Sequence, residues 1–299
     1  MFIGIDLGGT KIEGAVLDEQ RRVRFRERLP TNRDAGYSAI VARVAEMFRA
    51  CCEVAGRIPP FVGIGTPGAV SVSDGRMKNC NTTCLNDQPL LEDLQRALGT
   101  TVLLENDANL FAWAEALCGA GRGYEFVFGV ILGTGVGGGI VWRGQIWSGA
   151  QRLAGEWGHH RIALHGPECY CGQRGCVETL LSGPAVEAEA LKERGVRAPL
   201  PDVVRAARSG EAAARRVLAR FFENFGRALA NVINILDPSC IVLGGGVSNI
   251  EELYTLGREA VARHVFGRDF ATPILRHELG DSAGVIGAAL LAAERERGG

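Results

Sequence analysis

The chain has 299 residues, of which 46% are hydrophobic and 22% charged, as expected for a globular protein of one large domain or two ordinary ones. A formal net charge of −1 gives no broad attraction to nucleic acid or anionic membranes, and no apolar run is long enough to span a bilayer, so we expect neither as a partner. No signal peptide is apparent, and nine mostly scattered cysteines favour a reducing, cytoplasmic location over a disulfide framework.

The first part of the chain alternates predicted strands with predicted helices. Hydrophobic patterning predicts strands at 2–7, 11–17, 22–29, 61–66 and 102–105, and helices at 37–55, 90–98 and 107–118. This alternation favours an α/β fold.

The pattern then restarts. The segment 128–144 matches 3–19 without a gap, and both segments read as strand, glycine-rich turn, strand. Five positions carry the same residue in both copies. The pairs are Gly4 with Gly129, Leu7 with Leu132, Gly8 with Gly133, Gly14 with Gly139, and Val16 with Val141. The repeat predicts two similar α/β halves with their glycine turns facing a cleft, although two glycine-rich hairpins can also match by chance.

Helices dominate the rest of the chain. They are predicted at 183–194, 201–208, 211–235, 250–265 (with Asn249 as N-cap) and 282–296, with strands at 240–246 and near 273–276. We predict an N-terminal domain at 1–108, on which the closing helix at about 282–296 packs back, and a larger C-terminal domain at 109–281.

The segment 155–178 concentrates metal-binding side chains. Cys169, Cys171 and Cys176 fall within eight positions, and His159 and His160 precede the first cysteine by ten and nine residues. Three thiolates and one imidazole form the tetrahedral ligand set of a closed structural zinc site. We therefore predict a zinc loop inserted in the second domain, with either histidine as the fourth ligand.

Two glutamates flank the zinc loop, and an aspartate stands at the start of the helix predicted at 107–118. Glu156 and Glu178 bracket the cysteine cluster, and a metal-pinned loop would hold both carboxylates in place to bind hydroxyl-rich ligands or move protons. Asn106 and Asp107 follow the strand at 102–105. Asp107 can serve either as a helix cap or as a general base that takes a proton from a substrate hydroxyl.

Three glycine turns each follow a predicted strand, and backbone N–H groups in such turns can bind phosphate. Asp6 interrupts the strand before the first turn, where it can hold a divalent cation beside phosphates or bond the turn amides. Lys11 can neutralise a phosphate or point to solvent. No turn matches the Walker or Rossmann patterns, but together they predict a nucleotide polyphosphate site. The turns are Gly8-Gly9-Thr10, Gly133-Thr134-Gly135 and Gly244-Gly245-Gly246.

Seven motifs in this order resemble the ROK family (repressors, open reading frames and sugar kinases) of the actin-like ATPase superfamily, over essentially the whole chain. The resemblance implies an α/β fold of two actin-like (ribonuclease H-like) domains around a central cleft. It also implies phosphorylation of a hexose hydroxyl, usually the 6-OH, by ATP with Mg²⁺; homodimers are common in the family. The motifs are DLGGTK (6–11), GTPG (65–68), ENDAN (105–109), GTGVGGG (133–139), GEWGH (155–159), CYCGQRGCVE (169–178) and IVLGGGVSN (241–249).

The resemblance also implies roles for individual positions, with Asp107 as catalytic base. It selects His159 over His160 as the zinc ligand beside Cys169, Cys171 and Cys176. The implied sugar-binding set is Gly68, Asn81, Asn106, Asp107, Glu156, His159 and Glu178. The implied ATP and phosphate set is Asp6, Gly8, Gly9, Thr10, Lys11, Gly133, Thr134, Gly135, Gly244, Gly245 and Gly246.

Substrate choice within the family is predicted from three segments, 30–34, 78–90 and 277–289, which most resemble fructokinase or mannokinase members. We therefore expect fructose, mannose or glucose as acceptor; the alternative is an N-acetylglucosamine or N-acetylmannosamine kinase of the same family. Asn81 lies in one of these segments and can be a sugar contact or a plain surface residue. A ROK-type sugar-responsive repressor is the alternative of another class, but its relatives carry an added N-terminal DNA-binding segment, whereas the first strand here is predicted to begin at Phe2.

Overall fold

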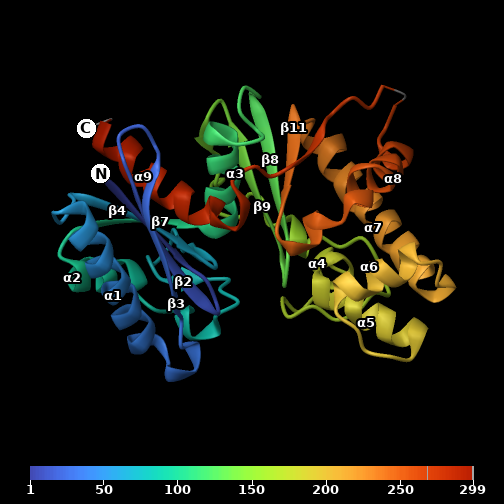
Figure 1. The fold of residues 1–299 in the computed structure, drawn as a ribbon, viewed down its shortest axis with the longest axis horizontal. Helices are drawn as coiled ribbons and strands as arrows, with labels where there is room; N and C mark the ends of the chain where they lie inside the picture. The colour runs from blue at the N-terminus through green and yellow to red at the C-terminus, as the bar shows by residue number, and fades with distance from the viewer. Residues whose placement is uncertain (268, 298–299) are drawn as a thin grey trace. The chain divides into compact units, whose positions relative to one another are not determined.

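A computed structural model describes residues 1–267 and 269–297, which divide into two compact α/β units (Figure 1). Unit 1 comprises Met1–Ala114, Ile146–Ala154 and Asp281–Gly299, and unit 2 comprises Glu115–Gln145 and Gly155–Gly280. The predicted two-domain α/β fold is thus confirmed. In the part of the chain that the structure describes, no helix combines the length and the apolar character needed to cross a membrane.

Unit 1 is built on a five-stranded mixed sheet of order β3-β2-β1-β4-β7. The first three strands form an antiparallel meander, and β4 and β7 join it in parallel. The strands are β1 (Phe2–Leu7), β2 (Lys11–Leu17), β3 (Val23–Pro30), β4 (Phe61–Thr66) and β7 (Thr101–Asn106), and a separate two-stranded ribbon pairs β5 (Ala69–Val70) with β6 (Met77–Lys78).

Helices cover both faces of this sheet (Figure 1). One face packs its isoleucines and valines against α1 (Tyr37–Ala55) and α2 (Leu90–Leu98) in one hydrophobic core. On the other face Gly4 and Gly63 are register partners, and a Cβ at either would overlap the backbone of α9 (Ala283–Arg297). The paired glycines therefore let α9 lie directly on the strands. The helix α3 (Asp107–Cys118) follows β7.

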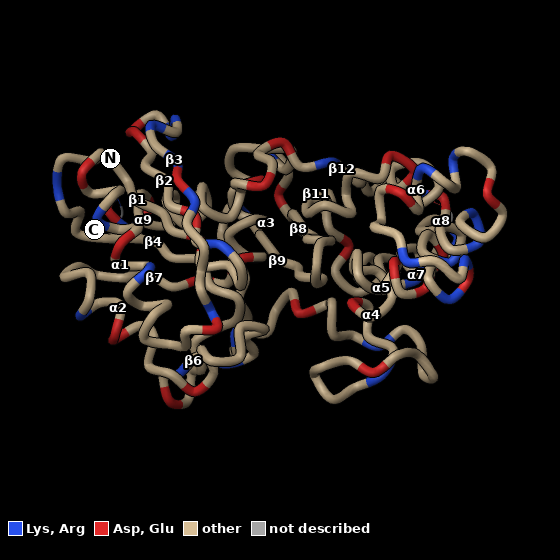
Figure 2. Tube along the Cα trace, turned by 60° about the horizontal axis from the view of Figure 1, so that its bottom comes forward, with Lys and Arg blue, Asp and Glu red and all other residues tan. Residues whose placement is uncertain are grey.

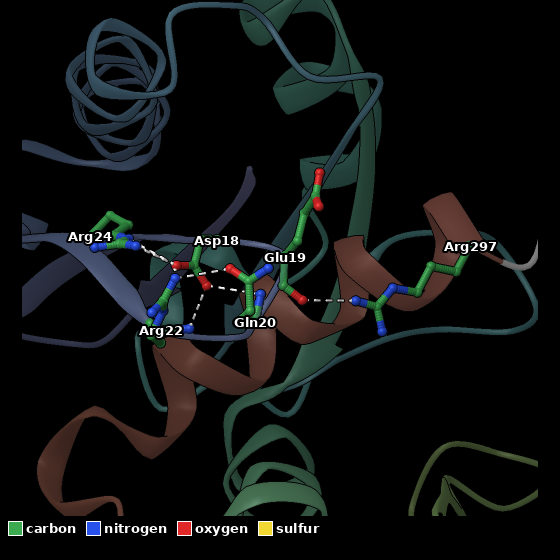
Figure 3. A network of polar contacts seen from close by, with 6 residues as sticks. All are labelled: Asp18, Glu19, Gln20, Arg22, Arg24 and Arg297. Carbon is green, nitrogen blue, oxygen red and sulfur yellow. Dashed lines mark hydrogen bonds and ion pairs between the residues drawn. The ribbon is translucent and has the colours of Figure 1, made fainter.

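The β2–β3 turn is held by one carboxylate (Figure 3). Asp18 accepts hydrogen bonds from the backbone N–H groups of Gln20 and Arg22 (both 2.9 Å) and from the guanidinium groups of Arg22 and Arg24 (both 2.8 Å). Partial burial acts to raise the pKa of Asp18, but these hydrogen bonds lower it to about 2. Arg297 of α9 donates to the Glu19 carbonyl (3.1 Å), which ties the end of the helix to this turn.

Unit 2 repeats the sheet topology of unit 1 with strand order β10-β9-β8-β11-β12. The strands β8 and β9 are antiparallel, and β11 is parallel to both β8 and β12. The predicted internal repeat is therefore confirmed as two sheets of the same connectivity. The strands are β8 (Phe126–Leu132), β9 (Val136–Trp142), β10 (Gln145–Ile146), β11 (Cys240–Gly244) and β12 (Ile274–Arg276).

The gapless alignment of the two copies is wrong beyond the glycine turn. In the first copy Ile5 pairs with Gly14, whereas in the second copy the matching Val130 pairs with Gly138 and not with Gly139. The second turn is one residue shorter, because Leu132 pairs with Val136 across three residues. A shift of one residue exchanges the two faces of a strand, so only a gap in the turn keeps the two copies equivalent.

The helices of unit 2 pack on one another around the longest, α7, with α5, α6 and α8 all in contact with it. The helix predicted at 250–265 is present as α8, but its predicted start and its N-cap at Asn249 are wrong: Gly246–Asn249 and Glu251–Tyr254 are 3₁₀ turns, and α8 begins only at Leu256. The helices are α4 (Glu178–Leu181), α5 (Gly183–Arg194), α6 (Leu200–Arg208), α7 (Ala212–Leu236) and α8 (Leu256–His264).

Acidic and basic residues are interspersed along both units (Figure 2). This distribution agrees with the formal net charge of −1.

Candidate functional site

The predicted zinc ligands converge in unit 2. His159, Cys169, Cys171 and Cys176 place their ligand atoms within 4.8 Å of one another. His159 Nδ1 lies 3.5 Å from Cys169 Sγ, and Cys171 Sγ lies 3.7 Å from Cys176 Sγ. Tetrahedral zinc with ordinary bond lengths would separate such atoms by about 3.6 and 3.8 Å. The four residues therefore fit a closed zinc site.

The neighbouring histidine lies outside this cluster. His160 Nε2 is 3.0 Å from Asn231 Nδ2 of α7, and burial lowers the pKa of His160. The cluster that could hold a metal therefore contains His159 and not His160, in agreement with the predicted ligand set. His159 presents Nδ1 to the cysteines, and its Nε2 lies 3.0 Å from the hydroxyl of Tyr170.

The two acids that bracket the zinc loop lie in different local settings. Glu156 directly precedes the 3₁₀ turn Trp157–His159, and this turn is fixed by the Trp157 indole, which donates to the Gly137 carbonyl (2.8 Å). Glu178 opens α4, and its Oε2 accepts the Val136 N–H (2.9 Å) at the start of β9. A Cβ at Gly135 would come within 2.7 Å of that oxygen. Glu178 therefore contacts the second glycine turn.

A cavity of about 560 Å³ in unit 2 begins at the second glycine turn. The turn is joined to the start of α5 by the Gly183 N–H, which donates to the Gly133 carbonyl (2.8 Å). Helix N-termini and glycine turns both offer N–H groups to phosphates. The cavity is lined by Gly133, Thr134, Gly183, Pro184, Glu187, Leu200, Pro201, Val204, Arg208, Gly246, Val247, Asn249 and Ile250.

The third glycine turn is only partly exposed to this cavity. Gly246 lines it, whereas Gly244 ends the buried strand β11. Gly245 has φ +80° and packs directly against the backbone of Leu132. The sequence reading missed the α5 and α6 side of the cavity, including Glu187 and Arg208, because a helical pattern does not show which residues face a ligand.

The first glycine turn lies in unit 1 between β1 and β2. The Gly8 N–H donates to the Lys11 carbonyl (3.0 Å). Thr31, which the sequence reading did not single out, is fully buried and clamps the turn: its hydroxyl donates to the Gly8 carbonyl (2.7 Å) and its N–H to the Thr10 carbonyl (3.0 Å). Lys11 Nζ lies 3.8 Å from Glu13, a buried carboxylate of β2.

Asp6 lies beside this turn and carries an unsatisfied oxygen. Its buried Oδ1 has no hydrogen-bond partner among residues 1–267 and 269–297. Burial, reinforced by the charges of Asp107 and Glu13 and opposed by Lys11, raises the pKa of Asp6 to about 7. A carboxylate oxygen in this setting needs a positive partner, and Asp6 therefore fits a divalent cation held beside phosphates.

Asn106 and Asp107 join β7 to α3 in unit 1. Asn106 Oδ1 accepts the N–H groups of Ala108 (2.9 Å) and Asn109 (3.2 Å), so Asn106 caps the helix. The Ala108 N–H also reaches Asp107 Oδ1 (2.8 Å). From the sequence, Asp107 is a candidate for either the helix cap or the general base. In the structure the preceding residue, Asn106, is the N-cap.

Gly68 and Asn81 lie near the same region of unit 1. Gly68 has φ +147°, and its carbonyl accepts Asn106 Nδ2 (3.4 Å) and the Thr66 hydroxyl (3.3 Å). Asn81 is exposed, and its Oδ1 would be 3.9 Å from a Cβ on Gly9. The structure thus brings the Gly68 carbonyl to Asn106 and Asn81 to the first glycine turn.

Known proteins similar to this chain match it over nearly its whole length. The ROK family model matches residues 2–295. The N-acetylgalactosamine kinase AgaK of Shewanella is 36% identical over 97% of this chain and 96% of its own length. An N-acetyl-D-glucosamine kinase of Citrobacter koseri is 35% identical over 97% and 99%.

Two solved structures share the fold. The ROK hexokinase of Thermus thermophilus superposes with a TM-score of 0.88 at 34% identity, covering 100% of this chain and 99% of that chain. A ROK family glucokinase of Streptomyces griseus, in complex with glucose and AMPPNP, gives 0.83 at 31% identity, covering 98% and 99%. The chain therefore belongs to the ROK family. Its enzyme class is that of the ATP-dependent sugar kinases of this family.

Proposed function

We propose that the chain is an ATP-dependent N-acetylhexosamine kinase that phosphorylates the 6-OH of N-acetylglucosamine or N-acetylgalactosamine. The observation that carries this proposal is the identity of 35–36% to kinases of these two sugars over 97% of the chain. These relatives favour the N-acetylhexosamine alternative over the first expectation of fructose, mannose or glucose.

In this proposal Asp107 is the general base that accepts the proton of the sugar hydroxyl as the phosphoryl group is transferred. Phosphoryl transfer depends mainly on positioning and charge neutralisation, so a single proton acceptor is sufficient. The position of Asp107 next to the helix cap supports this role, because the Asn106 hydrogen bonds fix the backbone on which it sits. The proposed sugar-binding partners are Gly68, Asn81, Asn106, Glu156, His159 and Glu178.

ATP is proposed to bind through the glycine turns. The cavity of unit 2 has room for adenosine between α5, α6 and the third turn, with Gly133 and Thr134 at its phosphate end. The first turn would contribute N–H groups of Gly8, Gly9 and Thr10 and the ammonium of Lys11. Mg²⁺ would be held near Asp6 and would neutralise phosphate charge. The zinc cluster has four protein ligands and therefore supports the loop that carries the sugar-binding acids without a catalytic step of its own.

A second acceptor class has its own support. The Thermus thermophilus hexokinase at 34% identity and the Streptomyces griseus glucokinase, which is in complex with glucose, at 31% identity support a non-acetylated hexose such as glucose as the second candidate.

A coupled assay of ADP release tests both acceptor classes. It is run with ATP and Mg²⁺ over N-acetylglucosamine, N-acetylgalactosamine, N-acetylmannosamine, glucose, mannose and fructose. We expect kcat/KM for the first or second sugar to exceed that of every non-acetylated hexose by about tenfold, the effect of one well-recognised polar substituent. The highest value for glucose, mannose or fructose would refute the N-acetylhexosamine assignment, and the absence of turnover with all six would refute the proposed reaction.

The position of transfer is tested with the 6-deoxy analogue of the preferred sugar. This analogue lacks the proposed acceptor oxygen, so we expect competitive inhibition without turnover. Phosphorylation of the analogue would exclude the 6-OH as the acceptor.

A further inference from the structure

The carboxylate of Glu105 is the centre of a hydrogen-bond network at the end of β7. Its Oε1 accepts the backbone N–H of Asn106 and the side-chain amide of Asn109, both at 2.9 Å. Its Oε2 accepts the hydroxyl of Ser148 at 3.3 Å. A single side chain thus contacts the strand end, the helix α3 and a segment that is forty-three residues away in the chain.

That distant segment is a compact loop of unit 1, residues 146–154, which we call the tethered loop. It is closed on itself, because the Ala154 N–H donates to the Ser148 carbonyl and the Arg152 N–H to the Gly149 carbonyl, both at 3.2 Å. A second contact holds it from outside, since Lys78 Nζ donates to the Gln151 carbonyl (2.8 Å). The loop therefore has an internal structure and two anchors on unit 1.

Both anchors lie next to proposed sugar-binding residues in the chain. Glu105 directly precedes Asn106 and Asp107, and Lys78 lies three residues before Asn81. The C-terminal end of the tethered loop leads within two residues to Glu156. One loop is thus connected, by hydrogen bonds or by the chain itself, to three parts of the proposed sugar-binding set.

We infer that Glu105 is a positioning residue of the phosphoryl transfer, which couples the tethered loop through Ser148 to the Asn106–Asp107 pair. This inference rests on the proposed function, because it requires Asp107 and Asn106 to act on the sugar. Glu105 orients the Asn106 peptide and the Asn109 side chain from one oxygen and fixes the loop with the other. Hydrogen bonds to a charged group are the stronger ones, and a small displacement of a catalytic group can reduce the rate by about 10²-fold.

The network predicts different effects for the removal of each part. Glu105→Ala removes all three hydrogen bonds, and we expect kcat/KM for the sugar to fall by on the order of 10²-fold. Glu105→Gln keeps one carbonyl oxygen for Asn106 and Asn109 and an amide that can donate to the Ser148 hydroxyl, so kcat/KM for the sugar should stay within about twofold of wild type. Ser148→Ala removes only the loop contact and lowers kcat/KM for the sugar by about fivefold.

If Glu105 only stabilised the fold, its replacement would change the kinetics for ATP as well as those for the sugar. We expect the KM for ATP to stay within about twofold of wild type in all three variants, while the sugar parameters change. Amide hydrogen exchange of residues 146–154 is expected to accelerate in the Glu105→Ala and Ser148→Ala variants only, which reports the tether without reference to activity. The matched controls are Glu46→Ala, on an exposed carboxylate of α1 paired with Arg43, and Ser209→Ala, on an exposed serine after α6.

The outcomes separate the inference from the proposed function. Wild-type protein that phosphorylates no sugar refutes the proposed function and this inference with it. An active wild type with unchanged sugar kinetics and hydrogen exchange in Glu105→Ala and Ser148→Ala refutes the inference alone. If Glu105→Ala does not fold, Ser148→Ala and Glu105→Gln decide: a selective loss of sugar kcat/KM in the first with near-normal activity in the second supports the inference, and equal values in both overturn it.

Discussion

Adjacent glycines of the third turn offer a test of which backbone positions serve the fold and which serve the ligand. Within residues 1–267 and 269–297, a Cβ added to Gly246 meets no atom of another segment within 4 Å, although this residue lines the cavity of unit 2. A Cβ added to Gly245 overlaps the Leu132 carbonyl oxygen and lies 2.7 Å from its carbon, at φ +80°. We therefore expect Gly245→Ala to lower the stability of the fold and Gly246→Ala to weaken ATP binding without loss of stability.

The expected sizes follow from these distances. Carbon atoms in contact are separated by about 3.5 Å, so Gly245→Ala must displace the backbone by about 0.8 Å. The overlap costs about 1–3 kcal/mol and the left-handed φ about 1–2 kcal/mol more, which gives about 2–5 kcal/mol in total. Gly246→Ala has no such overlap and restricts the unfolded chain, so stability should stay equal or rise by about 0.4–1 kcal/mol.

Gly246→Ala should weaken the binding of ATP although it does not lower stability. Its new methyl group would occupy cavity space, and an overlap with bound nucleotide worth about 1–3 kcal/mol raises the KM for ATP by roughly 5–150-fold. The KM for the sugar should not change. The melting temperature and the two KM values of each variant are sufficient to check this. Wild-type ATP kinetics in Gly246→Ala would show that ATP does not bind in this cavity. A wild-type melting temperature in Gly245→Ala would refute the packing argument.

Three further predictions concern single residues. Asp107→Asn should lower kcat by roughly 10²–10⁴-fold while calorimetry still detects sugar binding; undiminished kcat would remove Asp107 from the mechanism. Cys171→Ser should abolish the one zinc ion per chain in metal analysis and lower the melting temperature, and wild-type protein purified without zinc would contradict the site. Because the pKa of Asp6 is raised to about 7, the folded metal-free protein binds a proton that the unfolded chain releases near pH 4, so stability should fall as pH rises from about 4 to 7. Denaturant titrations without Mg²⁺ should show a smaller pH dependence over that range in Asp6→Asn, and equal slopes would contradict the raised pKa.

Regular elements were predictable from the sequence because their signals are local. The helices at 37–55, 90–98 and 107–118 have apolar residues at helical spacing or a clear cap, and the structure has helices over the same residues. The N-cap assigned to Asn249 failed because Asn249 ends one 3₁₀ turn, Gly246–Asn249, and a second, Glu251–Tyr254, follows before α8 starts. A residue type that is common at N-caps therefore does not by itself show where a regular helix begins.

The site was predictable where a residue type is chemically unusual for its position. The cysteines of the zinc loop and Asp6 within an apolar strand were recognisable in this way. Thr31 and Glu187 were not, because a threonine after a strand and a glutamate on a helix are ordinary in sequence. Their roles arise from contacts between distant segments: Thr31 with the first glycine turn, and Glu187 with the cavity wall, where it accepts the Leu200 N–H (2.8 Å).

The shorter second turn also makes the two copies of the repeat structurally different. The first turn has Asp6 in the strand before it and four residues between the paired Leu7 and Ile12, whereas the second has Ile131 at the matching position and three residues between the paired Leu132 and Val136. Duplication of a strand–turn–strand element therefore explains why both turns can offer backbone N–H groups. It does not make them equivalent, because the first copy alone has a carboxylate with a buried, unsatisfied oxygen at this position.

The start of α3 decides how clearly substitutions at the proposed base can be interpreted. An aspartate at the N-cap position stabilises a helix, and its replacement by alanine costs about 0.5–2 kcal/mol of stability. Here Asn106 Oδ1 accepts the N–H groups of Ala108 and Asn109, so the cap persists when Asp107 is changed. A loss of turnover in Asp107→Asn can therefore be assigned to the missing proton acceptor, whereas Asn106→Ala would disturb the helix start and the Gly68 contact together. Because Asn106 caps the helix and Asp107 is the proposed base, the general-base hypothesis can be tested at Asp107 without loss of the helix cap.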